Sequence, residues 1–242
     1  MSEPYEIIDP SLEPRLNAFG QPIGKSLPGW TGCARLPDID LIGRTCRVVP
    51  YQARHAAALF EAFAADDGRM WTYMPAGPFA DVDALHASIM DHQQNKGFHT
   101  FVILADGREI GHFSFMRYDT GNGTVEIGGV TYSPALQRST VATEAQYLMM
   151  KHAFDHGYRR YEWKCDQLNI PSNRAALRLG FQFEGTFRNA IVRSDRRRDT
   201  CWYAIIVEDW PAVRTRLEAW LDPANFDADG AQRQALRAIP AT

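Results

Sequence analysis

The sequence predicts a single α/β domain built on a mixed, mostly antiparallel central sheet flanked by helices. Three strand-like segments follow one another, separated by the turn sequences Asp106-Gly107 and Gly121-Asn122-Gly123, which both favour hairpins. After this meander, helical and strand-like apolar patterns alternate and end in a second pair of strands. Helices before, within and after the run of strands indicate one mixed domain.

The first 40 residues differ from the rest because Pro and Gly interrupt them repeatedly. We interpret 1–40 as an extended arm, 41–222 as the folded domain and 223–242 as a polar tail. The arm still carries apolar residues, which suggests that it lies over the surface of its own or a neighbouring subunit and makes a homodimer plausible. These apolar residues are Leu12, Leu16, Phe19, Ile23, Leu27 and Trp30.

Apolar spacing and turn residues define the elements of the first half of the domain. A strand at 45–50 and a helix at 55–63 are predicted first, followed by a helix at 81–94 with Asp81 as its N-cap. The three strands of the meander are then predicted at 99–105, 109–118 and 124–132.

The second half continues with a helix at 140–156, which Gly157 ends, and an aromatic-rich strand at 158–165. Ser172 is the predicted cap of a short helix that reaches Leu179. The remaining elements are strands at 181–192 and 200–207, an Arg-rich turn at 193–199 between them, and a helix at 210–221.

Composition narrows the classes of partner. The net charge is −3 at pH 7, so no global basic field favours nucleic acid. No apolar run approaches the ~18 residues that span a bilayer, and the N-terminus lacks a secretory signal, so we expect a cytoplasmic protein. The four cysteines are far apart and without metal-ligand spacing, which favours reduced thiols and no metal site.

A strand, a loop and a helix between Val125 and Ala145 are suited to holding an anion. The loop 137–142 runs into a helix, whose first backbone amides are unpaired and lie at the positive end of the helix dipole. Glu126 lies in the preceding strand, and simple alternation places it on the face shared by Gly128 and Val130. The small residue there leaves room for a ligand beside the carboxylate.

The segment Glu126-Ile127-Gly128-Gly129, the loop 137–142 and the later block from Asn169 to Gly185 together resemble the GNAT superfamily of N-acetyltransferases, RimJ/RimL type. The resemblance implies the acyl-CoA N-acyltransferase fold and an acyltransferase that uses acetyl-CoA. It implies a primary amine as acceptor, either a protein N-terminal α-amine or a small molecule. Thr140 stands where the family has Gly, and a β-branched residue resists positive φ and close ligand approach. A degenerate GNAT domain that binds CoA or a partner without catalysis is therefore the alternative.

The resemblance also implies roles for particular residues. Glu126 is the expected general base, acting through water, and Ser172 the expected donor to the leaving thiolate. Many members use a Tyr seven residues after the block's Asn, but that position is Ala176 here. The expected cofactor-binding residues are Val130, Tyr132, Gln137, Arg138, Ser139, Thr140, Val141, Ala142, Thr143 and Asn169.

Two further segments are candidates for the acceptor side of the site. The loop between the two early helices is rich in aromatic residues, and its candidates for substrate binding are Trp71, Tyr73, Met74 and Phe79. The arginines of 193–198 fit either a solvated hairpin tip or a contact to an anionic acceptor or partner.

Overall fold

The computed structural model describes residues 15–239. The chain divides into two compact units, and the boundary lies between Gly32 and Cys33. The described part of the first unit contains one small antiparallel hairpin, β1 (Arg15–Leu16) and β2 (Pro22–Ile23). Residues 1–14 of the predicted arm, including Leu12, lie outside the described residues.

The second unit is built on an eight-stranded sheet with the strand order β3-β4-β5-β6-β7-β8-β10-β9. Every neighbouring pair is antiparallel except β7 and β8, which run parallel. The mixed, mostly antiparallel sheet predicted from the sequence is thereby confirmed. The strands are β3 (Leu41–Ile42), β4 (Arg47–Pro50), β5 (His99–Ala105), β6 (Arg108–Asp119), β7 (Thr124–Tyr132), β8 (Arg160–Asp166), β9 (Gln182–Arg193) and β10 (Arg196–Ile206).

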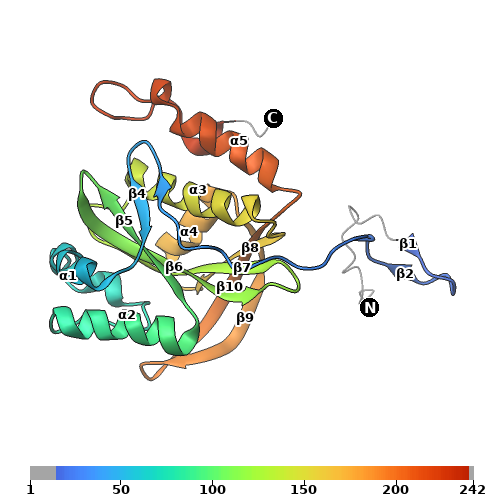
Figure 1. Ribbon diagram of the computed structural model, residues 1–242, viewed down its shortest axis with the longest axis horizontal. Coiled ribbons are helices and arrows are strands. Elements are labelled where there is room, and N and C mark those ends of the chain that lie inside the picture. Colours follow the sequence, from blue (N-terminus) through green and yellow to red (C-terminus); the bar gives the residue numbers. More distant parts are fainter. Residues whose placement is uncertain (1–14, 240–242) are drawn as a thin grey trace, which may run out of the picture. The chain divides into compact units, whose positions relative to one another are not determined.

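Helices cover both faces of this sheet (Figure 1). On one face, α1 (Ala56–Ala64) and α2 (Val82–Lys96) pack over a core that includes Leu59, Leu85 and Val102. The opposite core gathers residues of α3 (Thr140–Asp155), α4 (Ile170–Leu179) and α5 (Trp210–Leu221). Short 3-10 helices occupy Ala53–His55, Arg69–Trp71, Pro223–Asn225 and Leu236–Ala238.

Local chemistry explains why these boundaries were largely predictable. Asp81 caps α2, since its side chain accepts a hydrogen bond from the Ala84 amide at 2.8 Å. Gly157 has φ +83° directly after α3, a conformation that ends a helix at little steric cost. No helix in residues 15–239 is both long and apolar enough to cross a membrane.

The Arg-rich turn predicted at 193–199 is wrong. The turn consists only of Ser194 and Asp195, with φ of 48° and 60°, and β10 already begins at Arg196. Positive φ at both central residues gives a two-residue hairpin loop whose twist matches the strands it joins. The arginines from Arg196 onward are therefore strand residues with alternating faces, although Arg196 and Arg197 are still exposed to solvent.

A buried carboxylate fixes the start of α3 against the sheet. Glu144 accepts hydrogen bonds from the backbone amides of Arg44 at 2.7 Å and Thr45 at 2.6 Å. These two amides belong to the turn between β3 and β4, about 100 residues earlier in the chain. The N-terminal part of α3 is consequently held by tertiary contacts as well as by its own cap.

Candidate functional site

The site lies where the parallel strands β7 and β8 part. The two strands pair only from Thr124–Ile127 against Arg160–Trp163. Beyond that point β7 continues to Tyr132 and β8 to Asp166, each bonded to its outer neighbour but not to the other. The facing backbone groups of these two strand ends are thus free of strand partners and available to a bound molecule.

A β-bulge changes the faces of β7 at this place. Gly128 pairs with Ser114 and Thr131 with His112, so that Gly129 and Val130 together stand opposite one residue of β6. Gly129 takes up the bulge with φ +57°.

The bulge overturns one prediction. Simple alternation placed Glu126 and Val130 on one face, but Val130 packs against the α3-side core. Glu126 and Gly128 keep the opposite face. A Cβ on Gly128 would approach the Glu126 Oε1 atom to 3.5 Å. Gly128 therefore borders the carboxylate, but the room for a ligand that we expected there is filled by Met116, whose Sδ atom would lie 2.2 Å from such a Cβ.

Glu126 is a buried, ion-paired carboxylate rather than a solvated one. Its Oε2 atom accepts a hydrogen bond from Lys164 Nζ at 2.7 Å, and Arg117 Nε lies 3.3 Å from the same atom. Burial raises the pKa of Glu126, and the positive charges of Lys164 and Arg117 only partly offset this effect. The carboxyl group therefore holds its proton more tightly than an exposed glutamate does.

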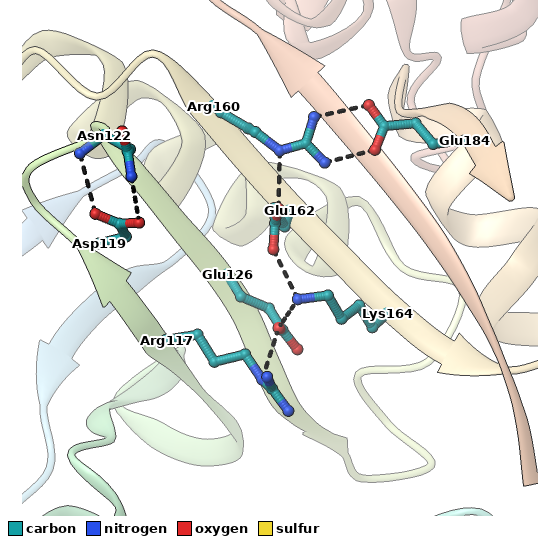
Figure 2. Close-up of polar contacts among 8 residues, drawn as sticks. All are labelled: Arg117, Asp119, Asn122, Glu126, Arg160, Glu162, Lys164 and Glu184. Atoms are coloured by element: carbon teal, nitrogen blue, oxygen red, sulfur yellow. Dashed lines mark hydrogen bonds and ion pairs between the residues drawn. The ribbon is translucent and has the colours of Figure 1, made fainter. Parts of the chain in front are cut away.

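Glu126 belongs to a chain of ion pairs that links residues of β6, β7, β8 and β9 (Figure 2). Lys164 also bonds Glu162 Oε2 at 2.7 Å, and Arg160 bonds Glu162 at 2.8 Å before it reaches Glu184 through both of its Nη atoms. The pKa of Glu162 is lowered: burial acts against this, but the hydrogen bonds from Lys164 and Arg160 outweigh it. The network holds Glu162 ionised and orients the lysine toward Glu126.

The loop before α3 has its left-handed residue at an unexpected position. Arg138 has φ +59°, whereas Thr140 is the first residue of the helix itself. Ser139 is the N-cap, since its Oγ accepts a hydrogen bond from the Ala142 amide at 3.1 Å. The strain that we expected at Thr140 therefore does not arise there.

The start of α4 corrects the predicted cap. Asn169, not Ser172, is the N-cap, because its Oδ1 accepts a hydrogen bond from the Ser172 amide at 3.2 Å and the helix begins at Ile170. Ser172 lies inside the first turn, where its Oγ accepts a hydrogen bond from Trp163 Nε1 at 3.1 Å. Because Trp163 belongs to the α3-side core, Ser172 and Glu126 flank the parted strands from opposite faces of the sheet.

The aromatic residues of the loop between α1 and α2 have two different roles: most pack in the core, and one lies near the site. Trp71 packs edge-on against Phe63 and Phe79, and Met74 joins the same core under α1 and α2. Tyr73 instead reaches outward, and its hydroxyl donates to the carbonyl of Leu168 at 3.0 Å, in the loop between β8 and α4. Of the four predicted acceptor residues, Tyr73 is the one with a hydrogen bond to the loop that follows β8.

Sequence reasoning missed Lys164 and Arg117, the partners of Glu126, and Glu162, which shares Lys164 with it. A signal was present: Arg160, Glu162 and Lys164 alternate with aromatic residues along β8, so they must share one face. Residues 15–239 contain no group of three or more His, Cys, Asp or Glu side chains that could hold a metal ion, and the four cysteines are free thiols.

Comparisons with known proteins identify the family. Residues 46–182 match the model of the acetyltransferase (GNAT) domain. A crystal structure of a GCN5-related N-acetyltransferase from Brucella melitensis has 36% sequence identity and a TM-score of 0.84, over 87% of this chain and 98% of that chain.

Two curated bacterial proteins are also similar. The uncharacterized N-acetyltransferase YnaD of Bacillus subtilis is 29% identical over 60% of this chain and 84% of its own length. The ribosomal-protein-serine acetyltransferase of Escherichia coli is 31% identical over 51% of this chain and 69% of its own length. Since the domain model spans more than half of the chain, this protein belongs to the GNAT family of acetyltransferases and is similar to members of the RimJ/RimL type.

Proposed function

We propose that this protein transfers an acetyl group from acetyl-CoA directly to a primary amine, without a covalent enzyme intermediate. The observation that carries the proposal is the parting of β7 and β8 after the pair Ile127–Trp163, next to a buried carboxylate. The free end of β7 leads through the loop 133–139 into the N-terminus of α3. An extended molecule with an anionic end fits that path, because its phosphates meet the helix and its length follows the strand.

The residues of this path suit CoA. The end of the loop and the first turn of α3, residues 137–143, would hold the pyrophosphate through backbone amides and the positive charge of Arg138. The amide of Val130, beside the bulge, would polarise the thioester carbonyl, and Tyr132 and Asn169 would line the pantetheine arm. The Asn169 side chain already accepts the Ser172 amide, so it would offer the ligand chiefly its NH₂ donors.

Glu126 and Ser172 would act on different groups from opposite faces of the sheet: Glu126 on the attacking amine and Ser172 on the leaving thiolate. The attacking amine must be neutral, and Glu126 would receive its proton through a water molecule. Lys164 would keep the carboxylate ionised and oriented before the transfer. Ser172 accepts a hydrogen bond from Trp163, and its own hydroxyl, which also contacts the Cys165 thiol, would turn to stabilise the departing thiolate.

The acceptor is either a protein N-terminal α-amine or a small-molecule amine. The ribosomal-protein acetyltransferase among the relatives favours the protein N-terminus. Mass spectrometry of short peptides and of small amines after incubation with acetyl-CoA separates the two. The alternative of a catalytically degenerate CoA-binding domain had Thr140 as its motivation. The helical backbone of Thr140 answers the objection from positive φ, and the objection that its side chain obstructs the cofactor is left to titration with acetyl-CoA.

The proposal is tested first by calorimetric titration with acetyl-CoA. We expect micromolar binding, and its absence would contradict the proposed cofactor. Glu126→Gln should then lower the acetyl-transfer rate about 100-fold or more while acetyl-CoA still binds. The matched control is Glu184→Gln, at the exposed end of the same ion-pair chain, which should retain the rate. Unchanged transfer by Glu126→Gln would refute the assigned base.

A further inference from the structure

One face of β10 carries polar atoms that are buried without a hydrogen-bond partner. Thr200 and Trp202 lie on the face opposite the core residues Cys201 and Tyr203. In residues 15–239, no partner is found for the Thr200 hydroxyl, the indole Nε1 of Trp202 or the Nε of Arg198. Thr200 is only 4% exposed to solvent.

These unpaired buried atoms destabilise the folded protein unless a bound molecule forms hydrogen bonds with them. A buried donor left unpaired typically costs about 1–3 kcal/mol, and native proteins rarely keep several together. Lys164 Nζ already lies 3.7 Å from the centre of the Trp202 ring, so the ring face is used and only its N–H remains free. Unpaired donors placed at alternate positions of one strand indicate a ligand that accepts hydrogen bonds.

Two positive charges, Arg193 and Arg198, and one negative charge, Asp166 of β8, lie beside these atoms. Arg197 pairs with Asp199, whereas neither Arg193 nor Arg198 has a carboxylate at ion-pair distance within the described chain. Burial, and next the charge of Arg198, lower the pKa of Arg193, while the charge of Asp166 acts in the opposite direction and is outweighed. Arg193 is held in place because its Nη1 donates to the carbonyl of Tyr73 at 3.0 Å. An anion near these two guanidinium groups would relieve their repulsion.

The same face continues directly to the proposed base. Trp202 pairs with Lys164, and Thr200 pairs with Asp166, two residues further along β8. Two residues of a strand span about 7 Å. A group bound at Thr200 would therefore lie roughly that far beyond the position of Lys164, within reach of a substrate whose amine is near Glu126.

We propose that Arg198, Thr200 and Trp202, with Arg193 beside them, bind a carboxylate of the amine acceptor. This inference rests on the proposed acetyltransferase function and names its substrate class, an amine with an acidic group within about two residues of the nitrogen. A guanidinium, a hydroxyl and an indole N–H form a donor set suited to a carboxylate. The carboxylate comes from the second residue of an acidic peptide or from a small amino acid.

The experiment compares acid and amide probes that differ only in charge. Isothermal titration of the CoA-loaded protein uses the peptide Ser-Asp-Ala-Ala-amide against Ser-Asn-Ala-Ala-amide, and 4-aminobutyrate against 4-aminobutanamide. At least one acid should bind about tenfold more tightly than its amide, and the pair that responds identifies the source. Arg198→Gln should abolish the preference, and Arg198→Lys should restore only part of it, because lysine keeps the charge and lacks the Nε fork.

The control variant is Arg197→Gln, on the neighbouring residue that already has Asp199 as its partner; it should leave the preference unchanged. Equal binding of acid and amide, no binding of any probe, or a preference that survives Arg198→Gln would overturn the inference. Acetyl transfer from acetyl-CoA is measured on the same probes. Acid-selective binding without any transfer would support the carboxylate site and count against the proposed function, so the two can fail separately.

Discussion

The ammonium group of Lys164 lies 2.7 Å from Glu126 Oε2 at a place where neither side chain is more than 7% exposed. Two charges this far from water are tolerated because each compensates the other, and Lys164 is further compensated by Glu162 at 2.7 Å. The pair therefore differs from exposed ion pairs, which contribute about 0–1 kcal/mol. Its role is to keep a carboxylate ionised inside the sheet, where burial alone would favour the neutral acid.

Removing the lysine charge should destabilise the protein and impair transfer at neutral pH. Lys164→Met leaves Glu126 buried without its nearest counter-ion, which typically costs about 3–5 kcal/mol. It should also raise the pKa of Glu126 further, so that transfer reaches its plateau only at a higher pH. Urea unfolding and a pH–rate profile measure the two effects. Arg197→Met, which removes an exposed guanidinium, should change stability by less than about 1 kcal/mol, and equal losses in both variants would contradict the argument.

The raised pKa of Glu126 should make its contribution to folding stability decrease as pH rises. Its pKa is higher in the folded protein than in the unfolded chain, so its contribution to stability is fully present below the ordinary glutamate pKa of 4.5 and is lost as pH rises through the folded value. The stability of Glu126→Gln relative to the native protein should therefore increase from pH 4.5 to pH 7.5. Chemical unfolding at several pH values checks this.

Glu218 provides a control of opposite sign. Burial acts to raise its pKa, but hydrogen bonds from Tyr147 and Arg214 outweigh this and lower it. A lowered pKa contributes stability above pH 4.5 that is lost on acidification. Glu218→Gln should thus become less stable relative to the native protein as pH rises. The same trend in both variants would show that Glu126 is not the source of the effect.

Much of the fold could be predicted because local chemistry sets the element boundaries. The strands His99–Ala105 and Thr124–Tyr132 were predicted at their observed bounds, since Gly-containing turns lie beside them. The bulge at Gly129 could not be predicted, because it depends on pairing with β6 rather than on the sequence of β7. Lys164 as partner of Glu126 depends likewise on which strands become neighbours, and that is a property of the sheet order.

A methyl group on Gly128 should displace Met116 and disturb the surroundings of Glu126. A Cβ at Gly128 would fall 2.2 Å from the Met116 Sδ atom, so the methionine has to move. Gly128→Ala should lower stability by about 1–3 kcal/mol, the usual cost of overpacking, and slow acetyl transfer. Met116→Ala should restore part of the stability in the double variant, because it removes the clashing atom. A double-mutant cycle by urea unfolding measures the coupling, and strictly additive losses would contradict the predicted contact.

Glycine at two positions of the loop before α3 should have opposite effects on stability. Arg138 has φ +59°, where a non-glycine residue costs about 1 kcal/mol, so Arg138→Gly should stabilise the protein. Thr140 is already the first helical residue, so Thr140→Gly should destabilise it slightly, because glycine loses more backbone freedom on folding. Thermal unfolding compares the two variants, and calorimetry with acetyl-CoA should show no gain in affinity for Thr140→Gly. A marked gain would mean that Thr140 obstructs the cofactor through its side chain, and the catalytically degenerate domain would then become the better description of this protein.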